Sequence, residues 1–295
     1  MTKSTWILGW RGMGKWFILP LIIAVLSCGS DGKKPSGETS GENVSDVIPV
    51  GVALYSFNRF PFPETLDKSK QAGAKLVEGF YFHKLGEDFD NKTMLELSDE
   101  DLMRMKKFID DEGLRMPSVY AGAKTEKDWN RFFEIGKILD LEFLVCEPEP
   151  AHWDFLDSLG GATGIKIAIH EHAKGKSRFW HPDSALLAIE GRPNIGACGD
   201  LGHWVRSGLD PVECLKKLEG HLIGIHAKDL DESGNIDAQD VKVGSGVIDY
   251  AAVLKELNRQ NFSGPMYIEC EHDWENNLGD VKYAVEYLRN LQTVN

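Results

Sequence analysis

Four segments in the second half of the chain decide the fold, because each is an apolar, strand-like run that ends in polar side chains. They are residues 165–172 (IKIAIHEH), 195–203 (IGACGDLGH), 222–229 (LIGIHAKD) and 265–271 (PMYIECE). Short apolar runs of this kind are typical of buried parallel strands. In a closed parallel barrel all strands end at one rim, so the polar residues that end these segments are expected to meet there.

Similar apolar runs alternate with amphipathic stretches over most of the chain. Strands are predicted at 50–57, 76–82, 116–120, 143–146, 165–170, 195–200, 222–226 and 266–269. Helices are predicted at 63–72, 99–112, 126–139, 183–190, 211–218, 250–261 and 280–291, with a weaker one at 152–159. Eight strands alternating with helices predict an α/β fold, a parallel sheet closed as a single (β/α)8 TIM barrel over residues 49–295.

The first 48 residues have the composition of an export signal followed by a tether. Residues 1–27 contain three basic residues and no acidic one, and their apolar run at 16–26 is short for a membrane span. Residues 25–28 (VLSC) resemble the lipobox of bacterial lipoproteins, although Val25 stands where Leu is commoner. The resemblance implies cleavage before Cys28 and lipidation of Cys28, with residues 28–48 as a flexible spacer.

The predicted location is therefore that of an exported lipoprotein, periplasmic or on the cell surface, held to the membrane only through its lipid. An uncleaved membrane anchor is the alternative. The formal net charge of −13 disfavours nucleic acid and anionic substrates, and no Lys/Arg-rich run offsets it. The expected partner is a neutral small molecule, and the sequence leaves a homo-oligomer open. A domain of this size needs no disulfides, so Cys146, Cys198, Cys214 and Cys270 are expected to be packing residues.

Strand alternation selects the side chains that face the barrel interior. If Ile165, Ile167 and Ile169 pack outward, His170 and His172 lie inside and Glu171 lies outside. The same rule gives three further pairs: Asp200 with Cys198, His226 with Lys228, and Glu269 with Glu271. Taken singly, such a His is more often a hydrogen-bonded structural group, and such an Asp a helix cap. Together they predict a metal site of His170, Asp200, His226 and Glu269, because carboxylates gathered in a barrel mouth need compensation.

Several of these motifs carry a family resemblance that covers residues 49–295. Asp200–His203 (DLGH) resembles a D-x-x-H motif, and His226–Asp229 (HAKD) an H-x-K-D strand end. Residues 242–249 (KVGSGVID) resemble a G-x-G-x-I-D segment, and residues 267–269 (YIE) a final strand that ends in Glu. The domain is thus similar to the xylose isomerase-like superfamily, the sugar phosphate isomerase/epimerase group, which also includes inosose dehydratase and endonuclease IV.

The resemblance implies metal ligands at Asp200, His226 and Glu269, with a fourth from the fifth strand. Where the epimerases usually have Glu in an E-x-H setting, this chain has residues 170–172 (HEH), a pattern more similar to inosose dehydratase. Glu147 at the end of the fourth strand could supply the missing carboxylate, or could be an exposed loop acid.

The chemistry that suits these residue types is removal of a proton next to a carbonyl. One divalent ion, Mn, Co, Zn or Fe, would stabilise the developing negative charge, and Glu269 or Glu147 would act as base. His203 and Lys228 are expected to orient a ligand or the substrate. The leading hypothesis is a sugar isomerase or epimerase, with a β-eliminating keto-sugar lyase or dehydratase as runner-up. A non-catalytic sugar-binding lipoprotein is the third.

An exported, strongly acidic protein is a poor match for sugar phosphates, so the expected substrate is an unphosphorylated, free or glycosidic carbohydrate. His172 and Glu271 are predicted to contact it, together with Trp180 and Trp204, which follow two site strands. Other aromatic side chains near the rim that could pack against a sugar are Tyr55, Phe57, Phe60, Phe80, Tyr120 and Trp274. Residues 83–91 and 231–243 are predicted to be lid loops, and 244–246 (GSG) a turn.

Overall fold

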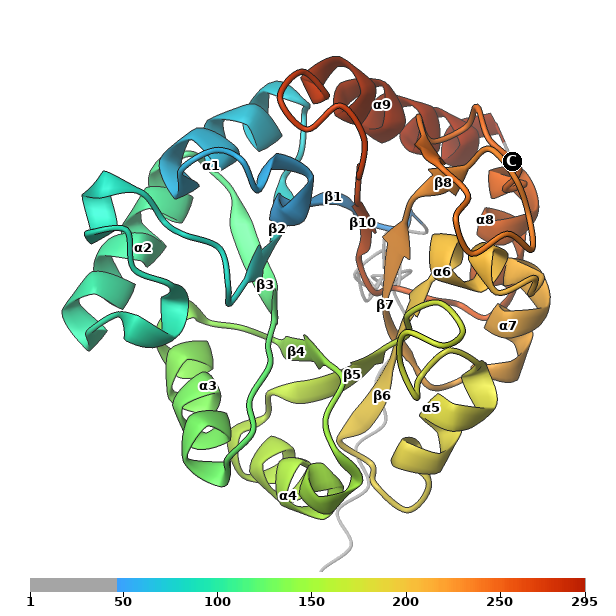
Figure 1. Cartoon of the computed structure of the whole chain (residues 1–295). Helices are drawn as coiled ribbons and strands as arrows, with labels where there is room; N and C mark the ends of the chain where they lie inside the picture. Colours follow the sequence, from blue (N-terminus) through green and yellow to red (C-terminus); the bar gives the residue numbers. More distant parts are fainter. Residues whose placement is uncertain (1–46, 295) are drawn as a thin grey trace, which may run out of the picture. The chain divides into compact units, whose positions relative to one another are not determined.

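The computed structural model describes residues 47–294 and contains a closed barrel of eight parallel strands ringed by helices (Figure 1). The order around the barrel is β1-β10-β7-β6-β5-β4-β3-β2. The strands are β1 (Val50–Ala53), β2 (Leu76–Phe80), β3 (Arg115–Tyr120), β4 (Phe143–Cys146), β5 (Lys166–His170), β6 (Ile195–Asp200), β7 (Leu222–Ala227) and β10 (Met266–Ile268). The predicted TIM barrel is confirmed.

Helices follow the strands along the chain and form the outer ring in Figure 1. They are α1 (Phe62–Gln71), α2 (Asp99–Asp111), α3 (Glu126–Leu139), α4 (Trp153–Thr163), α5 (Pro182–Ile189), α6 (Leu201–Arg206), α7 (Pro211–Lys217), α8 (Tyr250–Arg259) and α9 (Leu278–Val294). The weakly predicted helix at 152–159 continues through its two glycines to Thr163, and Gly164 ends it with φ of 79°. Glycine favours this position because left-handed backbone costs it little.

Several short elements were not predicted, among them α6. The first strand was expected to reach residue 57, but it stops at Ala53 and continues as a 3-10 helix, Leu54–Phe57. The expected lid loop at 231–243 is part of an antiparallel hairpin, β8 (Asp229–Leu230) with β9 (Asp240–Val241). The other expected lid contains a 3-10 helix, Glu87–Phe89. Apolar periodicity does not reveal elements this short.

Strand register places the polar strand ends side by side. Asp200 of β6 is level with His226 of β7, and His226 is level with Tyr267 of β10. His170 of β5 is level with Cys198, two residues before Asp200. Parallel pairing therefore brings residues more than 90 positions apart to one rim of the barrel.

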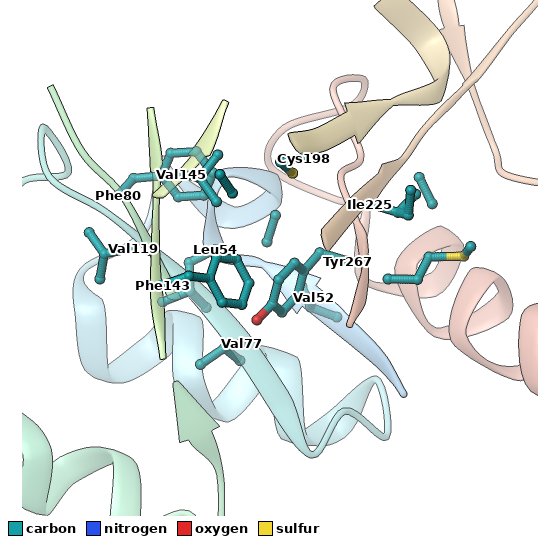
Figure 2. Close-up of a cluster of buried hydrophobic side chains, with 14 of the residues drawn as sticks. Val52, Leu54, Val77, Phe80, Val119, Phe143, Val145, Cys198, Ile225 and Tyr267 are labelled. Atoms are coloured by element: carbon teal, nitrogen blue, oxygen red, sulfur yellow. The ribbon is translucent and has the colours of Figure 1, made fainter. Parts of the chain in front are cut away.

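The barrel interior is mainly apolar, as Figure 2 shows for the cluster around Val52, Val77 and Tyr267. A polar group lies within it: the buried Glu78 carboxylate of β2 accepts a hydrogen bond from Ser118 Oγ at 2.7 Å, and Ser118 Oγ lies 2.9 Å from the Tyr267 hydroxyl. Burying a carboxylate is costly unless hydrogen bonds and positive charge surround it. A charged partner for Glu78 is therefore expected close by, at the rim.

The glycine-rich segment after the hairpin wraps around Asp229. Backbone N–H groups of Gly244, Gly246 and Ile248 donate to its carboxylate at 2.9, 2.9 and 3.1 Å. A Cβ on Gly246 would lie 2.3 Å from Asp229 Oδ1, so only glycine allows this close approach. The donors of this loop are therefore occupied by a side chain of the protein.

The predicted leader at 1–27, Cys28 and nearly all of the tether at 28–48 lie outside the described residues. Among residues 47–294, no helix combines the length and apolar character that a membrane crossing requires. Cys146, Cys198, Cys214 and Cys270 are buried free thiols, as expected of packing residues.

Candidate metal centre and substrate cavity

Donor atoms from four strand ends converge at the barrel mouth. His170 Nε2 lies 3.2 Å from His226 Nδ1 and 3.4 Å from Asp200 Oδ2. His226 Nδ1 lies 3.8 Å from Asp200 Oδ2 and 3.2 Å from Glu269 Oε2. Donors that surround a cation tetrahedrally at about 2.1 Å lie roughly 3.4 Å from one another. His170, Asp200 and His226 therefore lie at a spacing that fits one divalent ion, and Glu269 adjoins this group through His226.

Two of these candidate ligand atoms accept no hydrogen bond from the described residues. They are Asp200 Oδ2 and Glu269 Oε2, both buried. Asp200 uses its other oxygen, Oδ1, to accept from the His203 backbone N–H at 2.9 Å, which caps α6. Oδ1 is therefore the helix cap, and Oδ2 is left for the predicted role of metal ligand. Both oxygens lie beside the Lys228 ammonium, and a bound cation would add a second positive charge to these buried carboxylates.

Glu78 orients His226, and sequence analysis missed it. Its Oε1 lies 2.7 Å from His226 Nε2 and accepts a hydrogen bond from the Nε2–H group. This arrangement leaves the lone pair of His226 Nδ1 for a cation. Both side chains have no exposed area. The signal that could have found Glu78 is an acid in the centre of the apolar strand LVEGF, residues 76–80.

Glu147 orients His170, the last residue of β5, and His172 in the turn that follows it. Its Oε1 lies 3.3 Å from His170 Nδ1 and 2.9 Å from the Tyr120 hydroxyl, and it also contacts His172 Nδ1. Burial alone would raise the pKa of Glu147, but the hydrogen bonds from His170 and His172 hold it well below its usual value. Glu147 is therefore hydrogen-bonded to three side chains, and its role as a base stays a prediction.

Lys228 brings a positive charge to the carboxylates of the site. Its Nζ lies 3.2 Å from Asp200 Oδ2 and 2.9 Å from Glu269 Oε2, and it donates to Glu271 Oε1. Burial lowers the pKa of Lys228, but these carboxylates raise it well above its usual value. The ammonium is therefore charged, and it draws the pKa of the buried Glu269 well below the usual range.

His203 lies on α6, about one helical turn after Asp200. Its Nε2 lies 3.9 Å from Asp200 Oδ2, and its ring centroid lies 4.6 Å from that of His172. Burial drives the pKa of His203 well below its usual value, which favours the neutral imidazole. His203 and Lys228 thus stand beside the ligand cluster, where they were predicted to orient groups.

A cavity of about 230 Å³ opens above the cluster. Its polar lining comes from the site, namely His170, His172, His203, Lys228, Glu269 and Glu271. Its aromatic lining is Tyr55, Phe80, Phe82 and Tyr120, of which Phe82 was not predicted. Tyr120 stacks on Phe80 with ring centroids 5.5 Å apart. Apolar rings beside convergent polar groups suit a small carbohydrate, whose C–H faces pack on rings while its hydroxyls form hydrogen bonds.

The two tryptophans predicted to contact substrate do not line this cavity. Trp204 is fully buried, and its Nε1 donates to Glu171 Oε2 at 2.9 Å. Trp180 packs beside His181 and under the Lys174 ammonium. Trp204 is oriented by the helix that Asp200 caps, so its ring is directed into the core. Glu171 lies outside the ligand cluster as predicted but is buried there, and burial raises its pKa to about 8.

The comparisons agree with this architecture. Residues 151–291 match the family described as xylose isomerase-like TIM barrel. The crystal structure of an uncharacterised protein from Parabacteroides distasonis is 30% identical, covers 83% of this chain and 99% of its own, and superposes with a TM-score of 0.66. The chain belongs to the xylose isomerase-like TIM-barrel family.

More distant solved structures share the fold. A D-tagatose 3-epimerase-like protein is 18% identical over 84% of this chain and 98% of its own, with a TM-score of 0.67. A xylose isomerase-like TIM-barrel protein from Mycobacterium smegmatis, solved in complex with magnesium, is 16% identical over 84% and 97%, with a TM-score of 0.65.

Curated relatives of known activity match over a shorter stretch. An inosose dehydratase from Clostridium botulinum is 27% identical over 132 residues, which is 40% of this chain and 44% of that protein. One from Mesomycoplasma hyopneumoniae is 26% identical over 145 residues, 43% of this chain and 48% of that protein. The matched segment spans less than half of these relatives, although family membership points to an enzyme.

Proposed function

We propose that this protein is a divalent-metal-dependent enzyme that removes a proton next to the carbonyl of an unphosphorylated carbohydrate and completes an isomerisation or epimerisation. The observation that carries the proposal is the buried cluster of His170, Asp200 and His226, with the Glu269 carboxylate beside it, below a cavity of about 230 Å³. His170, Asp200, His226 and Glu269 would hold the ion. When bound, a divalent cation would stabilise negative charge on the carbonyl oxygen.

Two proton carriers flank the cavity. Glu269 follows β10, and His172 follows β5, with β7 and β6 between these strands in the barrel. His172 Nδ1 contacts Glu147, so Nε2 is the ring nitrogen left to accept a proton in the cavity. Epimerisation needs one group to remove a proton and another to return it from the opposite face. Glu269 and His172 can supply this pair.

A β-eliminating lyase is the second candidate, because inosose dehydratases are the curated relatives found. Elimination needs a single base, which takes the proton next to the carbonyl while the β C–O bond breaks. The departing oxygen then takes a proton from an acid at the cavity wall, where Lys228 and Glu271 lie. Both reactions share the first proton removal and differ in whether a substituent leaves.

The test is to incubate the metal-reconstituted protein with ketoses in D2O and follow the products by NMR. Deuterium entering the sugar without loss of a substituent supports isomerisation or epimerisation, and an unsaturated product supports elimination. D200N should abolish either reaction, whereas D67N, which changes an exposed carboxylate on α1, should leave it unchanged. The proposal fails if no exchange occurs with Mn, Co, Zn or Fe present.

The proposed location rests on the sequence alone. Export and anchoring through lipidated Cys28 would place the enzyme in the periplasm or on the cell surface. Cells fed labelled palmitate should label the wild-type protein and not C28S, whereas C214S, which changes a buried cysteine, should still be labelled. Labelling that survives in C28S would refute the anchor.

A further inference from the structure

A second chamber lies beside the metal cavity. It has a volume of about 610 Å³, compared with about 230 Å³ for the metal cavity. His203 and Glu271 line both spaces, so these two side chains form the boundary between them. A ligand that fills the smaller cavity and extends past this boundary therefore enters the larger chamber.

The outer wall of the chamber is the hairpin loop between β8 and β9, and this loop is fixed in place. Gly234 N donates to Val205 O of α6 at 2.9 Å. Arg206, also on α6, donates to Ala238 O at 3.3 Å and pairs with the Asp240 carboxylate. Because Asp200 caps α6, the same short helix connects the chamber wall with the metal site. A preformed site binds without the entropic cost of ordering a loop.

The chemistry of the chamber suits a neutral group rich in hydroxyls. Arg206 is paired with Asp240, and Lys176 lines the chamber together with Asp237 and Asp273, so the lining carries both charges and has no cationic cluster for phosphate. Asp237 and Gln239 are exposed on the same loop, and their carboxylate and amide oxygens can accept hydrogen bonds from hydroxyl groups.

We propose that the substrate is a glycoside whose reacting keto-sugar unit occupies the metal cavity while a second, uncharged sugar unit occupies this chamber. The inference deepens the proposed function and rests on it, since the metal cavity fixes which unit reacts. His203 and Glu271 then flank the bond between the units. The volume of the chamber leaves room for a complete second ring and its hydroxyls.

The test compares fructose with disaccharides that contain a ketose unit, namely lactulose, turanose and isomaltulose. Their affinities for the metal-reconstituted full-length protein are measured by calorimetry, and deuterium exchange is followed in the same samples. At least one disaccharide should bind with a Kd about tenfold lower than fructose. I236W, which places a large ring in the chamber wall, should bring the two affinities together. L187W adds the same ring to an exposed position on α5 and should keep the wild-type ratio.

Each outcome decides a separate claim. The chamber proposal is overturned if every disaccharide binds no tighter than fructose, or if I236W keeps the preference. Should fructose still exchange deuterium in that case, the proposed function stands and only the second sugar site is lost. If neither fructose nor any disaccharide binds or exchanges, both proposals fail together.

Discussion

Replacing Glu78 by Gln tests whether the barrel interior tunes the metal site. Glu78 Oε1 accepts the His226 Nε2 proton at 2.7 Å, and Glu78 Oε2 accepts from Ser118 Oγ at 2.7 Å. Glutamine keeps the size and one acceptor but removes the negative charge that makes His226 Nδ1 a stronger donor to a cation. Loss of such an orienting carboxylate typically lowers metal affinity about 10- to 100-fold, which corresponds to roughly 1.4 to 2.8 kcal/mol.

The assay is titration of the chelator-stripped protein with Zn²⁺ or Mn²⁺ in competition with a chelator, beside chemical denaturation of the same samples. We expect the Kd of E78Q to rise by that factor. E142Q is the matched control, because Glu142 is exposed and paired with Arg115 far from the site, and its Kd should be unchanged. A folded E78Q protein with wild-type metal affinity would refute the view that Glu78 acts through a ligand.

Two further predictions concern side chains near the site and in the core. A Cβ on Gly202 would lie 2.2 Å from Lys228 Cγ, so the substitution G202A should displace that buried side chain. We expect G202A to lower the free energy of unfolding by about 1 to 3 kcal/mol and to reduce deuterium exchange into the sugar. A wild-type melting temperature and exchange rate would contradict this. Burial lowers the pKa of His83 in the folded protein, despite the hydrogen bond between its ring and Phe60 O. In the unfolded chain His83 has its usual pKa of about 6.5, so as the pH falls the unfolded chain binds this proton before the folded protein does. The free energy of unfolding should therefore decrease as the pH falls below about 6.5, with at most about 1.4 kcal/mol per pH unit from His83. Urea denaturation between pH 7.5 and 5.5 measures this slope, which H83Q should reduce and the control H221Q should not.

The sequence predicted the barrel because the signals for it are local. Apolar runs of strand length and amphipathic stretches of helix length alternate along the chain, and β4, β6 and α3 begin and end where their patterns do. The inward direction of His170 and His172 likewise follows from the alternation of side chains along one strand. Once the strands are parallel and closed, the convergence of four strand ends at one rim follows from topology.

The partners of those residues could not be predicted, because they depend on contacts between distant strands. Glu78 and His226 are 148 residues apart and meet only across the closed barrel. The three side chains that hydrogen-bond to Glu147 come from β3 and from β5 with the turn after it. No pattern within β4 reveals them.

The sequence by itself determined the parallel barrel and the four polar strand ends, since periodicity and residue type act within one element. Tertiary structure alone decided which carboxylates gather beside the histidines of the barrel mouth, which are already hydrogen-bonded, and that Trp204 packs inward against Glu171. The physical reason is that the cost of a buried charge or ring depends on every neighbour packed around it, and those neighbours come from elements far apart in the chain.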